Sequence, residues 1–386
     1  NQAILSVVME PGVTSIGEEA FRDCSNLASV TIPEGVTSIG WGAFGCCNSL
    51  TSVTIPESVT SIGDYAFQLC SNLRSVEIKG ASSIGDSAFY DCKRLANVTF
   101  SGNVTSIGDS AFSGCERLTN VVLPESVTNI GAEAFFYCER LASVAMLGVV
   151  NIGNGAFSGC HSLTDVTIPD SAANIGNGAF SSCNLTSVTI PDSVEHIEGN
   201  AFYGCSNLER ILVDSNNSAY ASADGILFSK DYTALIAYPA AKKDTVCKIP
   251  KSVLVIGDGA FSDSKNLRNV TIPDSVTSIG GNAFSGCENL SNVTIPDSVT
   301  SIGVGAFGDC IRLTRVVIPD GVTEIKNVTF SCCASLTSVV IPDSVTKIGR
   351  QAFFACSDLA TVVIPGSVAS IGDQAFYDCR SLTNLI

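Results

Sequence analysis

A phenylalanine recurs at intervals of 22 or 23 residues along almost the whole chain, and this repeat constrains the fold more than any other feature. An alanine precedes every copy except Phe330, which follows Thr329. A unit of this length cannot bury its apolar side alone, so successive units must stack on one another. The sequence therefore predicts a solenoid. The recurring residues are Phe21, Phe44, Phe67, Phe89, Phe112, Phe135, Phe157, Phe180, Phe202, Phe261, Phe284, Phe307, Phe330, Phe353 and Phe376.

Each repeat combines two apolar patterns. Val53 and Ile55 alternate with polar residues, which is typical of a half-buried strand. Phe44, Cys47 and Leu50 lie three residues apart, the spacing of a short helical turn. We therefore expect an α/β leucine-rich repeat solenoid, with a curved parallel sheet on its concave face and short helical turns on its convex face.

Residues 214–246 depart from this repeat. Two apolar runs, 226–228 and 235–238, flank a polar turn, which indicates one inserted β-hairpin. The predicted organisation is one continuous solenoid. Its N-terminal block of 22–23-residue repeats covers 1–213, and its C-terminal block covers 247–386.

The inserted segment contains three tyrosines: Tyr220, Tyr232 and Tyr238. Aromatic residues are enriched at interfaces, so one interpretation is a protruding contact site that includes them. The other is an extra coil whose apolar residues continue the core. The sequence leaves both open.

The cysteines follow the repeat. A cysteine lies three residues after each recurrent phenylalanine, except after Phe261, where Ser264 takes its place. A cysteine in a fixed core position behaves as a small apolar residue, so we expect buried free thiols, with some disulfides as the alternative. No C-x-x-C motif occurs, and the two histidines, His161 and His196, are isolated. We therefore expect no metal site.

Composition and motifs argue against several function classes. A net charge of -16 disfavours nucleic acid as a partner, and no apolar run is long enough for insertion into a membrane. Two G-x-G-x-x-G matches, starting at Gly40 and Gly303, precede the strand of their repeat, whereas a nucleotide-binding loop follows one. We therefore predict that the chain is not an enzyme and has no catalytic or cofactor-binding residues.

One row of strand positions is unusual. The outward residue between the two buried strand positions is threonine in most repeats, but it is Val317, Val340 and Val363 in three successive repeats, with Arg315 at one edge. An exposed apolar stripe often marks an interaction site. We therefore predict that these four residues contact a partner. The alternative is that valine simply suits a strand.

The repeat pattern L-x-x-V-x-I-P-[DE]-S-V-T-x-I-G-x-x-A-F-x-x-C resembles the BspA-like class of bacterial leucine-rich repeat proteins. The resemblance covers nearly the whole chain and is structural, since the family has no catalytic residues to transfer. The residues of one repeat that match the pattern are Leu50, Val53, Ile55, Ile62, Phe67 and Cys70.

The resemblance implies a function. Family members are mostly surface-exposed or secreted, and several resemble adhesins. We therefore expect a non-enzymatic module of a bacterial cell-surface or secreted protein, with a protein or glycan ligand on the concave face. The alternative is a structural spacer or scaffold within a larger surface protein. Because the repeats begin and end incompletely, we expect further domains of the same polypeptide on either side.

Overall fold

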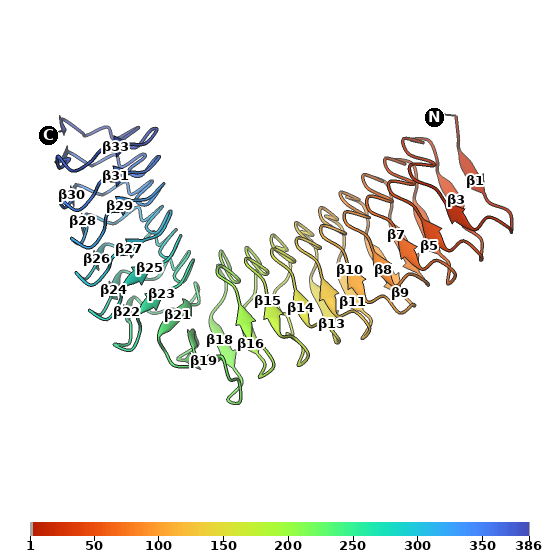
Figure 1. Ribbon diagram of the computed structural model, residues 1–386, viewed down its shortest axis with the longest axis horizontal. Helices are drawn as coiled ribbons and strands as arrows, with labels where there is room; N and C mark the ends of the chain where they lie inside the picture. The colour runs from red at the N-terminus through yellow and green to blue at the C-terminus, as the bar shows by residue number, and fades with distance from the viewer. Residues whose placement is uncertain (1–2, 386) are drawn as a thin grey trace. The chain divides into compact units, whose positions relative to one another are not determined.

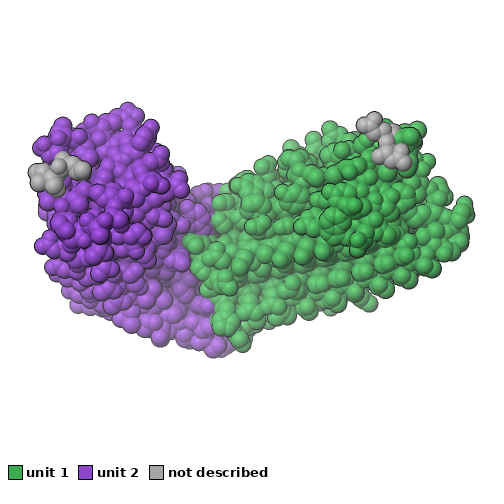
Figure 2. All heavy atoms as spheres, turned by 45° about the horizontal axis from the view of Figure 1, so that its top comes forward, with its two compact units in different colours: residues 1–202 green, residues 203–386 purple. Residues whose placement is uncertain are grey.

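The structure is a computed structural model that describes residues 3–385, and it contains two compact units, residues 1–202 and residues 203–386 (Figure 2). The chain winds through about 16 coils, and each unit is a stack of them. Every regular element between residues 3 and 385 is a β-strand (Figure 1). The predicted helical turns, and with them the α/β class, are therefore wrong: the fold is a β-solenoid.

The coils of unit 1 contribute strands of two kinds. Two-residue strands pair in parallel from coil to coil in one continuous sheet, for example Ser38 with Ser61 and Ile39 with Ile62. Longer strands pair in parallel in the shorter sheets β1–β3, β5–β7–β9 and β11–β13. The longer strands are β1 (Ser6–Val8), β3 (Ser29–Thr31), β5 (Ser52–Ile55), β7 (Ser75–Ile78), β9 (Asn97–Phe100), β11 (Asn120–Leu123), β13 (Ser143–Met146) and β16 (Ser187–Ile190). The two-residue strands are β2 (Ser15–Ile16), β4 (Ser38–Ile39), β6 (Ser61–Ile62), β8 (Ser83–Ile84), β10 (Ser106–Ile107), β12 (Asn129–Ile130), β14 (Asn151–Ile152), β15 (Asn174–Ile175) and β17 (His196–Ile197).

Unit 2 repeats this design and contains the insertion. The predicted hairpin is present as antiparallel β20 and β21, and a third strand, β19, also pairs antiparallel with β20. Because β21 pairs in parallel with β23, the insertion is part of the solenoid sheet. The first strands are β18 (Arg210–Val213), β19 (Tyr220–Ala223), β20 (Ile226–Ser229) and β21 (Ala234–Ala237). The longer strands that follow are β22 (Val246–Lys248), β24 (Asn269–Thr271), β26 (Asn292–Thr294), β28 (Arg315–Val317) and β30 (Ser338–Val340). The two-residue strands are β23 (Val255–Ile256), β25 (Ser278–Ile279), β27 (Ser301–Ile302), β29 (Glu324–Ile325), β31 (Lys347–Ile348), β32 (Thr361–Val362), β33 (Ser370–Ile371) and β34 (Asn384–Leu385).

The segment around each phenylalanine is a series of turns because its N–H groups alternate between two kinds of acceptor. The amide of Ala43 donates to Gly40 O and that of Cys47 donates to Phe44 O, each three residues earlier in the same coil. The intervening amide of Phe44 donates instead to Ala66 O of the next coil, at 2.7 Å. An α-helix would require each N–H group to bond four residues back within its own segment. Hydrogen bonds between coils thus replace the helical ones.

Backbone angles in this segment also exclude a helix. Two residues in each turn adopt positive φ, as Tyr65 and Leu69 do at 58° on either side of Phe67. L-residues enter the left-handed region singly and do not propagate a helix there. The three-residue spacing of the apolar side chains therefore arises from successive tight turns.

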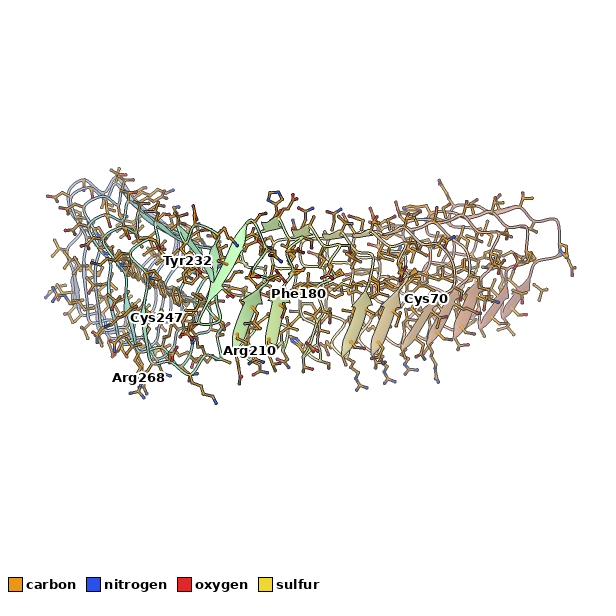
Figure 3. The ribbon with its side chains drawn as sticks, turned by 90° about the horizontal axis from the view of Figure 1, so that it is seen from below. Cys70, Phe180, Arg210, Tyr232, Cys247 and Arg268 are labelled. Carbon is orange, nitrogen blue, oxygen red and sulfur yellow. The ribbon has the colours of Figure 1, made fainter. Side chains whose placement is uncertain are left out.

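The core consists of columns of identical side chains that run from coil to coil. The rings of Phe44 and Phe67 are stacked with centroids 5.1 Å apart and planes 9° from parallel, and both rings are fully buried. The thiol of Cys70 donates to the carbonyl oxygen of Phe44 in the preceding coil at 3.2 Å. Figure 3 shows Cys70 and Phe180 within the stack of unit 1. The repeated phenylalanine and cysteine thus join neighbouring coils through ring stacking and a thiol–carbonyl hydrogen bond.

The predicted burial of the cysteines is confirmed, and it has a consequence for their reactivity. Of the seventeen cysteines, all are buried except Cys46, Cys332 and Cys379, which are partly exposed. Burial raises the pKa of the Cys92 thiol to about 12, so this group stays neutral at pH 8. Because the thiolate is the reactive form, we expect a thiol reagent at pH 8 to modify only the three partly exposed cysteines of the native protein.

Denaturation without reductant should expose the remaining thiols, so that mass spectrometry then detects seventeen modified cysteines. A denatured count several thiols below seventeen would show that disulfides are present and contradict the expectation.

Candidate binding surface

The row predicted from the sequence is present on the outer side of three successive coils in unit 2: Val317 and Val340 end the strands β28 and β30, and Val363 directly follows β32. Val317 pairs with Val340 in the parallel ladder between β28 and β30. The pairing of Ser338 with Thr361 continues the register into the next coil and places Val363 beside Val340. The three valines are exposed to 47%, 47% and 55%. We call Val317, Val340 and Val363 the valine row.

The alternation of the strands explains this exposure. Val316, the residue before Val317, points into the core and is 1% exposed, because successive side chains of a strand face opposite sides. In the neighbouring ladder of β24 and β26 the outward pair is Thr271 with Thr294. Equivalent strand positions therefore carry a hydroxyl-bearing residue in one sheet and an apolar residue in the next.

Arg315 supplies a cationic edge to the valine row. It is exposed on the same outward side of β28, two residues before Val317, and pairs with Ser338 of β30. Within residues 3–385, no carboxylate lies within ion-pair distance of its guanidinium group. A ligand with a negative group beside an apolar one would match this edge.

The tyrosines of the insertion lie elsewhere in unit 2 and are mostly inaccessible. Tyr220 and Tyr238 are 8% and 4% exposed, and Tyr238 stacks on Phe261 with centroids 5.0 Å apart, as a phenylalanine does in other coils. Tyr232 is partly buried against Phe228, at a centroid distance of 5.3 Å. The insertion thus continues the core, and of the three tyrosines only Tyr232 presents appreciable surface to a partner.

Unit 1 contains an apolar hollow that was not predicted from the sequence. Val144–Leu147 and Thr167–Ser171 line a depression of about 450 Å³, and the side chain of Leu147 is 63% exposed at its side. The loop from Met146 to Ile152 is one residue shorter than the corresponding loop of another repeat, from Ile55 to Ile62, and it lacks the proline that follows Ile55 there. The 22-residue interval between Phe135 and Phe157 was the sequence signal for this irregular coil.

An aromatic cluster on the turns of unit 1 was also missed. The ring of Trp41, which is 39% exposed, meets Tyr65 edge-on at 5.6 Å, and the guanidinium of Arg22 lies over the indole at 5.3 Å. Its members lie in successive coils, 19 and 24 residues apart, so no local window of sequence contains the cluster.

The part of the chain that the structure describes contains no evident metal-binding site. Among residues 3–385, no three His, Cys, Asp or Glu side chains are grouped so that they could hold a metal ion. In the same range there is no helix long and apolar enough to cross a membrane.

Stacked coils of 22 or 23 residues, with parallel strands and repeated leucine and phenylalanine columns, define a leucine-rich repeat solenoid protein. The family model described as BspA type leucine rich repeat region (6 copies) matches residues 1–82, 77–150, 145–223, 241–360 and 277–386. The chain belongs to this family, as the sequence resemblance predicted. Leucine-rich repeat proteins of this kind are generally non-enzymatic.

Solved structures of bacterial proteins are similar along most of the chain. A leucine rich cell surface protein from Faecalibacterium prausnitzii is 32% identical with a TM-score of 0.64, over 99% of this chain and 87% of that one. A leucine-rich repeat protein from Eubacterium ventriosum is 29% identical with a TM-score of 0.62, over 85% of this chain and 90% of that one. The pneumococcal vaccine antigen PcpA, 22% identical with a TM-score of 0.57 over 100% and 78% of the two chains, shares the fold. No curated protein sequence matches.

Proposed function

We propose that this chain is a non-enzymatic binding module of a bacterial cell-surface or secreted protein, and that it holds a protein or glycan ligand against the valine row. The observation that carries this proposal is the exposure of Val317, Val340 and Val363 side by side on a β-surface. Exposed apolar patches on soluble proteins mark interaction sites more often than isolated apolar residues do. The similarity to a leucine rich cell surface protein supports the location.

The chemistry of the surface indicates how a ligand would be held. A partner's apolar group would cover the valine row and remove it from water, while Arg315 would pair with a negative group at the edge. Adhesion to another cell or to a host glycoprotein is the specific role that we propose.

The test replaces all three valines of the row by threonine. The triple variant V317T/V340T/V363T should keep its thermal stability, because Thr271 and Thr294 occupy equivalent positions in the same unit. Affinity should fall about tenfold, which corresponds to about 1.4 kcal/mol. Binding would be measured by surface plasmon resonance against a panel of purified host glycoproteins and by a printed glycan array.

A matched control replaces three exposed valines outside the row. The variant V122T/V246T/V304T removes the same number of methyl groups at side chains that are 67%, 48% and 46% exposed, and it should bind like the parent. Unchanged affinity in the folded V317T/V340T/V363T protein would remove the valine row from the binding surface. If the parent binds nothing on either panel, the chain acts as a spacer instead.

A further inference from the structure

Three successive coils of unit 1 carry an arginine at the same position, immediately before the buried leucine of the coil. Asn120 pairs with Ser143 between β11 and β13, and this register places Arg117 beside Arg140. Lys93 reaches Glu116 of the next coil at 2.9 Å, which likewise places Arg94 beside Arg117. We call the set the arginine column; its members are Arg94, Arg117 and Arg140, all exposed.

The guanidinium groups of the column lack carboxylate partners. Among residues 3–385, no carboxylate oxygen lies within 4.0 Å of any of the three, although the chain has a net charge of -16. The adjacent Lys93 is paired with Glu116 and Asp91. Within the described residues, the hydrogen bond of the Arg94 side chain is to the amide oxygen of Asn72, at 2.8 Å. The column therefore keeps its positive charge available for a ligand.

The stacking brings these charges close together. Neighbouring strands of a sheet lie about 4.8 Å apart, so the backbone positions of the three arginines follow one another at about this step along the coils. Like charges at such a distance repel each other, and an anionic ligand relieves the repulsion. Arg74, one coil earlier and also exposed, accepts a hydrogen bond at its carbonyl oxygen from the Ala96 amide beside the column, and its side chain extends the cationic surface.

The surface next to the column carries polar groups suited to hydroxyl-rich ligands. Asn97, Asn120 and Ser143 form an exposed row three residues after the arginines, and Ser143 donates to the amide oxygen of Asn120 at 2.6 Å. These amides and hydroxyls both donate and accept hydrogen bonds. The residues that dominate binding at protein–protein interfaces lie instead in desolvated pockets and are often aromatic. This polar row therefore fits a hydroxyl-rich ligand better than a protein.

Spacing also disfavours an acidic peptide. Side chains on one face of an extended peptide recur at about 6.8 Å, which does not match the step of about 4.8 Å between coils. A chain of sugars with carboxylate or sulfate groups supplies anions for the arginines and hydroxyls for the neighbouring row. We propose that the arginine column and the adjacent polar row form a binding site for an acidic polysaccharide. This site is separate from the valine row and does not depend on it.

The test measures binding of the whole chain to two probes, heparin for sulfate groups and polygalacturonate for carboxylates, by isothermal titration calorimetry at 50 and 200 mM salt. Binding of at least one probe should weaken as salt increases, because charge interactions at an exposed site are screened. The variant R94Q/R117Q/R140Q should bind that probe at least tenfold more weakly. The probe that binds identifies the anionic group.

The matched control is R268Q/R312Q/R350Q, which changes the net charge equally at exposed arginines of unit 2. Arg312 occupies the column's position in its own coil but has no arginine in the same position of the neighbouring coils, and Figure 3 shows Arg268 at the edge of unit 2. This control should bind like the parent. The variant R94K/R117K/R140K keeps the charge but lacks the planar guanidinium fork, so it should retain intermediate affinity.

Three results would overturn the proposal. The first is that neither probe binds the parent at 50 mM salt. The second is an equal loss in both glutamine variants, which would show that net charge alone determines binding. The third is equally tight binding of polyglutamate, which would assign the site to acidic peptides. Thermal melts that match the parent would show that the variants remain folded.

Discussion

Replacing Phe307 by alanine is expected to lower the free energy of unfolding of unit 2 by about 3–5 kcal/mol. The ring is fully buried and is stacked between Phe284, at a centroid distance of 5.1 Å, and Phe330, at 5.5 Å. Alanine would leave a cavity and remove both ring contacts at once. Because each coil contacts mainly its neighbours, the damage should remain local and broaden or split the urea unfolding transition.

An exposed aromatic residue in unit 2 provides the control for Phe307. Tyr377 is 59% exposed and stacks on Phe354 on the outside of the coils. Its replacement by alanine should cost less than about 1 kcal/mol, since substitutions at the surface have small effects. A loss that small at Phe307 itself would show that the phenylalanine column does not stabilise the stack.

The longer strand and the core columns could be predicted from the sequence because the residues that determine them lie within one repeat and recur in the others. The alternation around Val53 and Ile55 has the period of a strand, and both residues are buried in β5. The repeated phenylalanine identified the column that contains Phe307. Each inference required only a residue's place within its own repeat.

The turn around each phenylalanine was predicted wrongly because its determinant is not local. Phe44, Cys47 and Leu50 have the three-residue spacing of a helical turn, but the backbone donors between them bond to the next coil. Only a stacked neighbour supplies those acceptors. The second strand of the coil, β4 (Ser38–Ile39), has two residues, and no period can be read from so short a segment.

The insertion shows how a change of residue type conceals a core position. Tyr238 follows Ala237, so the alanine–aromatic pair of the repeat is retained with tyrosine as the aromatic residue. The structure places this ring on the phenylalanine column beside Phe261. The enrichment of aromatic residues at interfaces had suggested a contact residue, but Tyr238 is buried.

The candidate surfaces were only partly predictable. The alternation of strand residues predicted that Val317 points outward, and the exposure of this side chain confirms that direction. The role of Val317 in binding stays a prediction. The arginine column had a sequence signal, a Cys-x-Arg-Leu motif in three successive repeats that begins at Cys92. The ion pairs around the column could not be predicted from the sequence, because Lys93 pairs with Glu116 of another coil.

Replacing Gly303 by alanine is expected to destabilise unit 2 by about 3 kcal/mol or more, since overpacking against backbone atoms cannot be relieved by moving a side chain. A Cβ atom there would lie 2.2 Å from Gly281 N and 2.3 Å from the carbonyl carbon of Gly280, in the preceding coil. Urea unfolding followed by circular dichroism would measure the loss.

Gly17 provides a control at the same repeat position. It belongs to the first complete turn of the described chain, and a Cβ atom there would meet nothing within 4 Å. Neither glycine has positive φ, so alanine at Gly17 should leave stability unchanged or raise it by about 0.4–1 kcal/mol through the unfolded state. The close approach of coils then explains why glycine recurs after the isoleucine of the two-residue strand. Equal effects at Gly303 and Gly17 would show instead that the recurrent glycine serves the geometry of its own turn.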